Sequence, residues 1–160
     1  MKLNHLLVLF LILGLAAQAQ AQQQNDVSSV LEVYKITTNE DGDEIATQTS
    51  EVTPGDLIEY RLIYTNNLEN GITQLRPVLP IPIGMEYLLD SADPNLEGAS
   101  LSNSGSFQAT PLTRDVRQPD GTTTTEEVPG REYRRLRWLV PSLEAGDQVI
   151  LVARVKVIEE

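Results

Sequence analysis

The sequence contains no cysteine, and its single histidine, His5, lies in an apolar segment near the N-terminus. Without cysteine the chain has no disulfide, no thiol nucleophile and no thiolate ligand for zinc. If the N-terminal segment is cleaved, imidazole is lost too, and with it the usual base of a serine triad. Only Lys35 and Lys156 supply lysine after that segment, and the spacing of the many acids singles out no catalytic pair. We therefore expect a protein that is not an enzyme and that holds no metal and no cofactor.

Only one long apolar run is present, at residues 6–15, and it is too short to span a bilayer. Lys2 precedes it, and two small-x-small cleavage sites follow at Ala17-Gln18-Ala19 and Ala19-Gln20-Ala21. These features predict a signal peptide at residues 1–21, a flexible polar lead at residues 22–29, and export to the periplasm or the extracellular space. No second apolar run follows, so we expect no integral membrane segment after cleavage.

Basic residues are few. The chain has 12 Lys and Arg against 23 Asp and Glu, which gives a formal net charge of -11. A negative field of this size repels nucleic acid and anionic lipid. The partners we expect are therefore other envelope or extracellular proteins. The length of 160 residues is that of a single domain with its own core.

Helical patterns are absent, and strand patterns are clear. At residues 57–65 apolar side chains at even positions alternate with mostly polar ones, and residues 148–158 form a valine-rich alternating run. A third run, at residues 134–140, places Trp138 on the same side as Leu136 and Val140. This alternation predicts a core position for Trp138. The alternative is an exposed ring that stacks on a sugar.

Turn residues separate these strands. Asp41-Gly42 predicts a hairpin between residues 30–38 and 44–50, because Asp-Gly supplies the positive φ of tight hairpins. Pro119-Asp120-Gly121 predicts a second hairpin tip. The prolines of residues 75–83 cannot donate to a ladder, so this segment is expected at a sheet edge or in an extended connection. Together the patterns predict an all-β fold, either a sandwich or a barrel.

Several motifs occur in a fixed order. They are Pro54-Gly55-Asp56, the strand end Tyr64-Thr65-Asn66-Asn67, the run Leu79-Pro80-Ile81-Pro82-Ile83-Gly84-Met85-Glu86-Tyr87, and the closing run Leu136-Arg137-Trp138-Leu139-Val140-Pro141-Ser142-Leu143-Glu144-Ala145-Gly146-Asp147. This order resembles the "domain of unknown function eleven" repeat of bacterial surface proteins. The resemblance implies an immunoglobulin-like β-sandwich of two antiparallel sheets over residues 30–158, with a longer insert at residues 96–130. The insert, with Leu112-Thr113-Arg114, Asp120-Gly121 and Glu132-Tyr133-Arg134, resembles a subgroup of small stand-alone exported proteins.

Three side chains are candidates for an interaction site. Arg135 and Arg137 share one face of a predicted strand and could present two guanidinium groups to a carboxylate or phosphate, or could pair with acids of a neighbouring strand. Asp120 lies at the predicted tip of the insert. Asn39, Asp41 and Asp43 could supply oxygens to calcium, but a solvated hairpin tip is the preferred interpretation, because the rest of a calcium loop is missing.

The expected function is that of an exported, non-enzymatic structural or protein-interaction module of the bacterial cell envelope. The insert at residues 96–130 is the first candidate for the partner surface. The alternative is a small-ligand binder, for a glycan or calcium, on the same sandwich.

Overall fold

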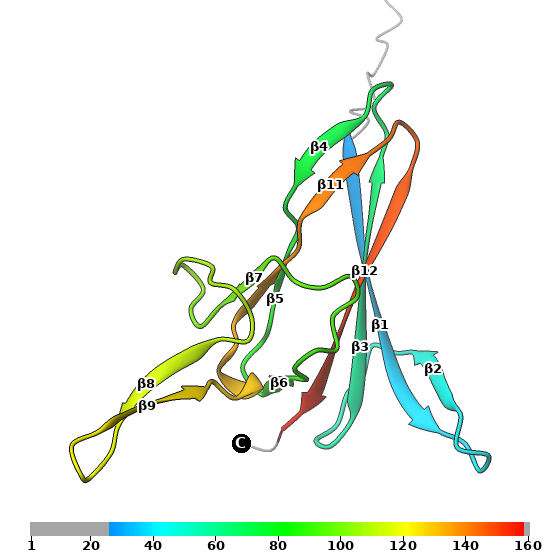
Figure 1. Ribbon diagram of the computed structural model, residues 1–160. Coiled ribbons are helices and arrows are strands. Elements are labelled where there is room, and N and C mark those ends of the chain that lie inside the picture. The colour runs from blue at the N-terminus through cyan, green and yellow to red at the C-terminus, as the bar shows by residue number, and fades with distance from the viewer. Residues whose placement is uncertain (1–25, 159–160) are drawn as a thin grey trace, which may run out of the picture.

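The computed structural model describes residues 26–158 (Figure 1). Over these residues the chain is all-β, with twelve strands, one 3-10 turn (η1, Gly130–Glu132) and no α-helix. The strands are β1 (Val27–Thr38), β2 (Glu44–Gln48), β3 (Leu57–Asn66), β4 (Ile72–Leu75), β5 (Val78–Pro80), β6 (Met85–Tyr87), β7 (Gly98–Ser100), β8 (Thr113–Arg117), β9 (Thr123–Glu127), β10 (Arg135–Arg137), β11 (Val140–Leu143) and β12 (Gln148–Val157). Every pairing between them is antiparallel, which confirms the predicted class.

The largest sheet has five strands in the order β2-β1-β3-β12-β6. Its centre, β3, is the strand predicted at residues 57–65, and Ile58, Tyr60 and Leu62 are buried as the alternation requires. The opposite face of β3 is less exposed to solvent than predicted, because Glu59 is also buried, at 6% exposure. The first hairpin is confirmed by pairing between β1 and β2.

The smaller sheets are a three-stranded sheet β5-β10-β7 and a two-stranded sheet β11-β4. Residues 134–140 were predicted as one strand, but they divide between β10 and β11, which belong to different sheets. At the division the backbone N–H of Trp138 donates to the carbonyl of Pro77 over 3.1 Å. The expected edge position of the proline-rich segment is confirmed, because β5 lies at the edge of its sheet.

The core lies where one face of the five-stranded sheet meets the smaller sheets. Trp138 is completely buried, as predicted, and its indole Nε1–H donates to the carbonyl of Pro94 over 2.8 Å. Leu136 and Leu151 are also fully buried and belong to the same cluster. Full burial of such aliphatic side chains contributes about 1.5–3 kcal/mol each relative to exposure.

The segment at residues 96–130 is not one separable insert. Its beginning forms β7, which pairs with β10 and is buried, so it is part of the folded body. The hairpin of β8 and β9, residues 113–127, extends away from the rest of the chain (Figure 1), and we call it the arm. The buried Leu112 and Val128 flank the arm and anchor it in the core.

The N-terminal boundary also differs from the expectation. β1 begins at Val27, because Val27, Ser28 and Ser29 pair with β3, so these residues belong to the sheet and not to a flexible lead. The predicted signal peptide at residues 1–21 and the first residues of the lead lie outside the described residues. Within residues 26–158 no helix is long and apolar enough to cross a membrane.

Candidate functional site

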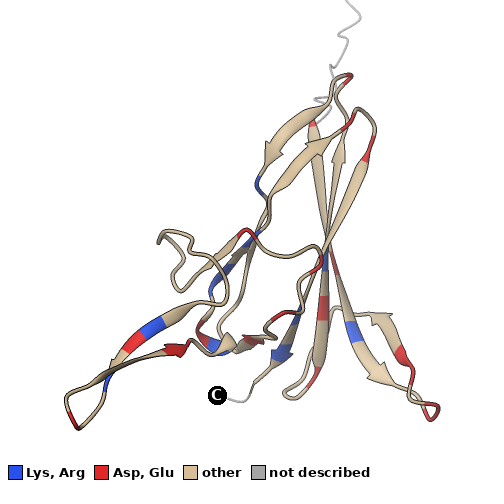
Figure 2. Ribbon diagram, viewed as in Figure 1, with Lys and Arg blue, Asp and Glu red and all other residues tan. Residues whose placement is uncertain are grey.

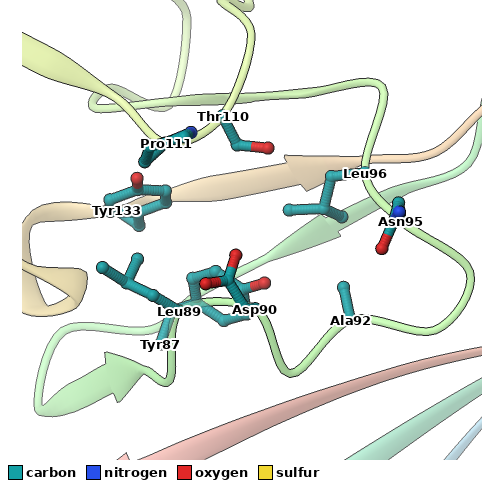
Figure 3. Close-up of a pocket in the computed structure, with 9 residues that line it drawn as sticks. All are labelled: Tyr87, Leu89, Asp90, Ala92, Asn95, Leu96, Thr110, Pro111 and Tyr133. Atoms are coloured by element: carbon teal, nitrogen blue, oxygen red, sulfur yellow. The ribbon is translucent and has the colours of Figure 1, made fainter.

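A pocket of about 300 Å³ lies at the base of the arm (Figure 3), and we call it the tyrosine pocket. Its lining residues are Tyr87, Leu89, Asp90, Ala92, Asn95, Leu96, Thr110, Pro111 and Tyr133. They come from the end of β6 and the loop after it, from the approach to β8 and from the residue after η1. The pocket therefore depends on three chain segments that are distant in the sequence.

Two buried tyrosines form one wall of the pocket. The ring centroids of Tyr87 and Tyr133 are 5.5 Å apart and the planes are tilted by 44°. The backbone N–H of Leu112 donates to the phenol oxygen of Tyr133 over 2.8 Å. Burial raises the pKa of both phenols above the ordinary value, so both remain neutral at physiological pH. This wall is buried and uncharged.

Polar side chains converge on the same pocket. Asp90, Asn95 and Thr110 line it, and within residues 26–158 their side chains make no hydrogen bond or ion pair. Asp90 adopts a φ of 60°, the left-handed region that non-glycine residues rarely use, and its carboxylate is directed into the pocket (Figure 3). The pocket thus offers one carboxylate, one carboxamide and one hydroxyl to a ligand that carries N–H or O–H donors.

The predicted guanidinium pair lies elsewhere. Arg135 and Arg137 do share a face of β10, and both lie over the ring of Phe107, at 4.5 and 4.2 Å from its centroid. Arg137 also forms an ion pair with Glu97 at 2.7 Å. Arg135 donates to the carbonyl of Ser102 over 2.9 Å and to that of Gly105. Both groups are therefore engaged within the chain, and they hold the loop after β7 against the sheet.

Asp120 lies at the tip of the arm and is exposed, as the turn pattern predicts. Its Oδ1 accepts hydrogen bonds from the backbone N–H of Thr122 over 2.9 Å and from the Thr122 hydroxyl over 2.6 Å. These bonds favour the ionised carboxylate and lower the pKa of Asp120.

The acidic hairpin tip is organised by its own hydrogen bonds. The Oδ1 atom of Asn39 accepts the backbone N–H groups of Asp41 and Asp43, over 3.0 and 2.8 Å. Both oxygens of Glu44 accept from the guanidinium of Arg154, over 2.9 and 2.7 Å. Among the described residues no group of three or more Asp, Glu or His side chains is arranged to hold a metal ion.

A charged network covers the outer face of the five-stranded sheet, and the sequence did not reveal it. The chain of contacts runs from Glu44 to Arg154, then to the buried Glu59, and on to Arg61 at 2.7 Å. The guanidinium of Arg61 lies 4.1 Å from the centroid of the Tyr34 ring. Hydrogen bonds to Glu44 and Glu59 raise the pKa of Arg154, so its guanidinium stays charged in the folded protein. Every charge in it is paired, which makes it a structural feature of the sheet and not a free binding site.

Comparison of the chain with protein-family models, with curated proteins and with solved structures finds no match.

Proposed function

We propose that this protein is an exported, non-enzymatic module of the bacterial cell envelope that binds another envelope or extracellular protein through the arm and the tyrosine pocket. In this proposal residues 1–21 direct export and are removed. The body is an immunoglobulin-like β-sandwich of the "domain of unknown function eleven" type. The core between the five-stranded sheet and the smaller sheets supports this architecture.

The arm carries the proposal. All five residues of β9 and four of the five residues of β8 are exposed, so the arm adds almost nothing to the core. An isolated two-stranded hairpin is at best marginally stable in water. Here it is held only at its base, where Leu112 and Val128 are buried and Arg114 pairs with Glu132 at 2.8 Å. A projecting hairpin with two open edges is well suited to contact a partner.

The pocket at the base of the arm supports the same function. A partner that lies along the arm would place a side chain near Asp90, whose carboxylate has no ion pair in the described structure. A lysine or arginine of the partner fits this environment, because it can donate to the carboxylate and stack on the aromatic wall. A side chain anchored in a pocket of the partner protein is typical of the energetic centre of an interface.

The chemistry of the pocket supports binding over catalysis. Asp90 is the only carboxylate among its lining residues, and no lysine, histidine or cysteine lies among them. A hydrolase with two carboxylates needs a second acid within about 5–10 Å across the substrate. A neutral phenol such as that of Tyr133, already occupied by the Leu112 N–H, is a poor base.

A small-ligand binder is the second candidate, and the same pocket favours it. An aromatic wall beside a carboxylate, a carboxamide and a hydroxyl matches the donors and acceptors of a sugar. In this case the ligand is a neutral glycan, and the arm is not required. The two candidates therefore differ in the part of the surface that binding needs.

Site-specific crosslinking tests the first candidate. Because the chain has no cysteine, Thr123→Cys on the arm and Thr73→Cys on β4 each provide one site for a photoactivatable label. We expect the same partner to be crosslinked from Thr123→Cys in native envelopes and not from Thr73→Cys. Equal capture from both positions, or capture from neither, would contradict a partner site on the arm.

A shortened arm provides the matched control. Thr113 and Glu127 are directly paired, so replacing residues 114–126 by Asn-Gly closes the hairpin with a favourable turn and retains the buried anchors. Loss of the partner, with unchanged thermal stability of the body, supports the first candidate. Glycan binding on an array that survives in this variant but is lost in Asp90→Asn supports the second candidate instead.

A further inference from the structure

Half of β1 has a neighbour on one side only. Residues 27–36 pair with β3 in an uninterrupted register, whereas β2 covers β1 only from Tyr34 to Thr38. The last contact on that side is the hydrogen bond from the Thr49 N–H to the Val33 carbonyl, over 3.0 Å. Among the described residues no strand pairs with the segment Val27 to Val33 on the β2 side.

The free hydrogen-bonding groups of this edge can be identified. The carbonyl of Val33 faces β2, and in an antiparallel ladder both backbone groups of a residue point to the same side, which alternates along the strand. Ser29 and Leu31 therefore present their N–H and C=O groups outward, away from β3. No backbone hydrogen bond in the described structure involves these groups. They form a template for one more strand, in line with β2.

The side chains of the edge are also exposed. Val30 is 54% exposed on one face of the sheet and Leu31 is 48% exposed on the other. Val30 continues a cross-strand row with Ile63 of β3 and Ile150 of β12, and Ile150 is 50% exposed. An added strand with apolar side chains would cover Val30 and Leu31. Natural edges are usually protected by lysine, proline or a bulge, and residues 27–33 contain none of these.

The charge around this edge of β1 determines whether a basic or an acidic segment can bind there. Arg61 lies opposite Glu32 and pairs with Glu59. Apart from Arg61, the segments that build this half of the sheet and its adjoining turns, residues 26–34, 60–75 and 138–153, contain no lysine or arginine. They contain five acids: Asp26, Glu32, Glu69, Glu144 and Asp147. None of these acids forms an ion pair within the described structure, and Figure 2 shows acidic positions without basic ones at this end of the molecule. A basic segment is attracted here, and an acidic one is repelled.

We propose that the edge of β1 from Val27 to Val33 binds an extended, basic segment of a partner protein as an added antiparallel strand. Hydrogen bonds to Ser29 and Leu31 supply the backbone pairing, apolar side chains of the segment cover Val30 and Leu31, and its lysines or arginines face the surrounding acids. This site is separate from the arm and the tyrosine pocket, so it stands or fails independently of them.

Peptide binding tests the proposal. The probe is a short fluorescent peptide of alternating valine and lysine, and the control probe alternates valine and glutamate. Ser29→Pro removes one outward N–H without touching the ladder to β3, whereas Ser29→Ala retains that N–H. We expect the valine-lysine peptide to bind, Ser29→Pro to weaken it about tenfold, and Ser29→Ala to change little. Equal binding to Ser29→Pro would show simple charge attraction and would overturn the proposal.

Hydrogen exchange gives a second measurement that needs no variant. The valine-lysine peptide should slow exchange at the amides of Ser29 and Leu31, and the valine-glutamate peptide should not. Protection confined to the arm, or no protection, contradicts the proposal. Light scattering of the protein alone examines the other occupant, a second copy: a dimer that Ser29→Pro dissociates would mean that the edge pairs with itself, which also overturns the proposal.

Discussion

The backbone N–H of Leu112 donates to the phenol oxygen of Tyr133 over 2.8 Å, and both residues are buried. Leu112 immediately precedes the arm, and Tyr133 forms the wall of the tyrosine pocket. The hydrogen bond therefore fixes the direction in which the arm leaves the body and, at the same time, the position of the pocket wall. A partner that moves the arm would therefore also shift the wall of the tyrosine pocket.

Tyr133→Phe is expected to destabilise the protein by about 1–3 kcal/mol, because it leaves the buried N–H of Leu112 without an acceptor. The free energy of unfolding in urea measures this change. Tyr60→Phe is the matched control, since the Tyr60 hydroxyl makes no hydrogen bond within the described structure, and this variant should stay within about 0.5 kcal/mol of the parent. Equal losses in the two variants would mean that the Leu112 bond contributes nothing.

Gly130→Ala is expected to prevent stable folding. A Cβ atom at this position would lie 1.8 Å from the carbonyl oxygen of Tyr87, a backbone atom that cannot move aside without displacing β6. The expected cost is more than about 4 kcal/mol. Gly121→Ala provides the contrast, because Gly121 has open space around it and only its φ of 89° is unfavourable, at about 1 kcal/mol. Circular dichroism and yield of soluble protein compare the two variants.

Much of the fold could be predicted because alternation reports burial directly. The strand at residues 57–65 and the strand at residues 148–158 coincide with β3 and β12 within one residue at each end. Both hairpins could be predicted from their Asp-Gly and Pro-Asp-Gly turns, because a tight turn needs a residue with positive φ and glycine adopts it readily. The burial of Glu59 could not be predicted, because it depends on Arg154, which is 95 residues away in the sequence.

The candidate site was harder to predict than the fold. Arg135 and Arg137 were correctly placed on one face, but Phe107, which covers both, lies in a loop without periodicity. The tyrosine pocket draws on irregular segments around Asp90 and Thr110 that only the folded core brings together. Its wall residues Tyr87 and Tyr133 belong to motifs of the sequence analysis, but nothing in those motifs marked them as part of a pocket.

Trp138 provides a direct test of the core. It is the only tryptophan and it is fully buried, so its emission should be blue-shifted and acrylamide should quench it weakly in the folded protein and strongly in urea. Trp138→Ala should cost about 3–5 kcal/mol through the lost contacts and the cavity left behind. Strong quenching in the folded state would place the ring at the surface and would favour the alternative in which it stacks on a sugar.

Calcium titration tests the acidic hairpin tip. We expect no heat of binding, because the side-chain oxygen of Asn39 already accepts two backbone N–H groups and Glu44 is engaged by Arg154. Calcium requires six to eight oxygens, more than the remaining carboxylates of Asp41 and Asp43 supply. Heat with micromolar affinity that disappears in Asp41→Asn would contradict this prediction.

Alkaline pH should destabilise the protein through its buried tyrosines. Burial raises the pKa of Tyr60, Tyr64, Tyr87 and Tyr133 above the ordinary value of 10.0. Between the unfolded and folded pKa values the unfolded chain loses these protons while the folded chain keeps them. The free energy of unfolding is therefore unaffected below that window and falls as pH rises through it.

Urea unfolding at a series of pH values, followed by circular dichroism, measures this decline. The midpoint should stay level up to about pH 9 and fall above about pH 10, where phenols of the unfolded chain ionise. The urea midpoint of Tyr60→Phe should decline less steeply than that of the parent, because the substitution removes one phenol whose pKa burial raises in the folded state. A midpoint that falls equally in both proteins would assign the decline to other groups.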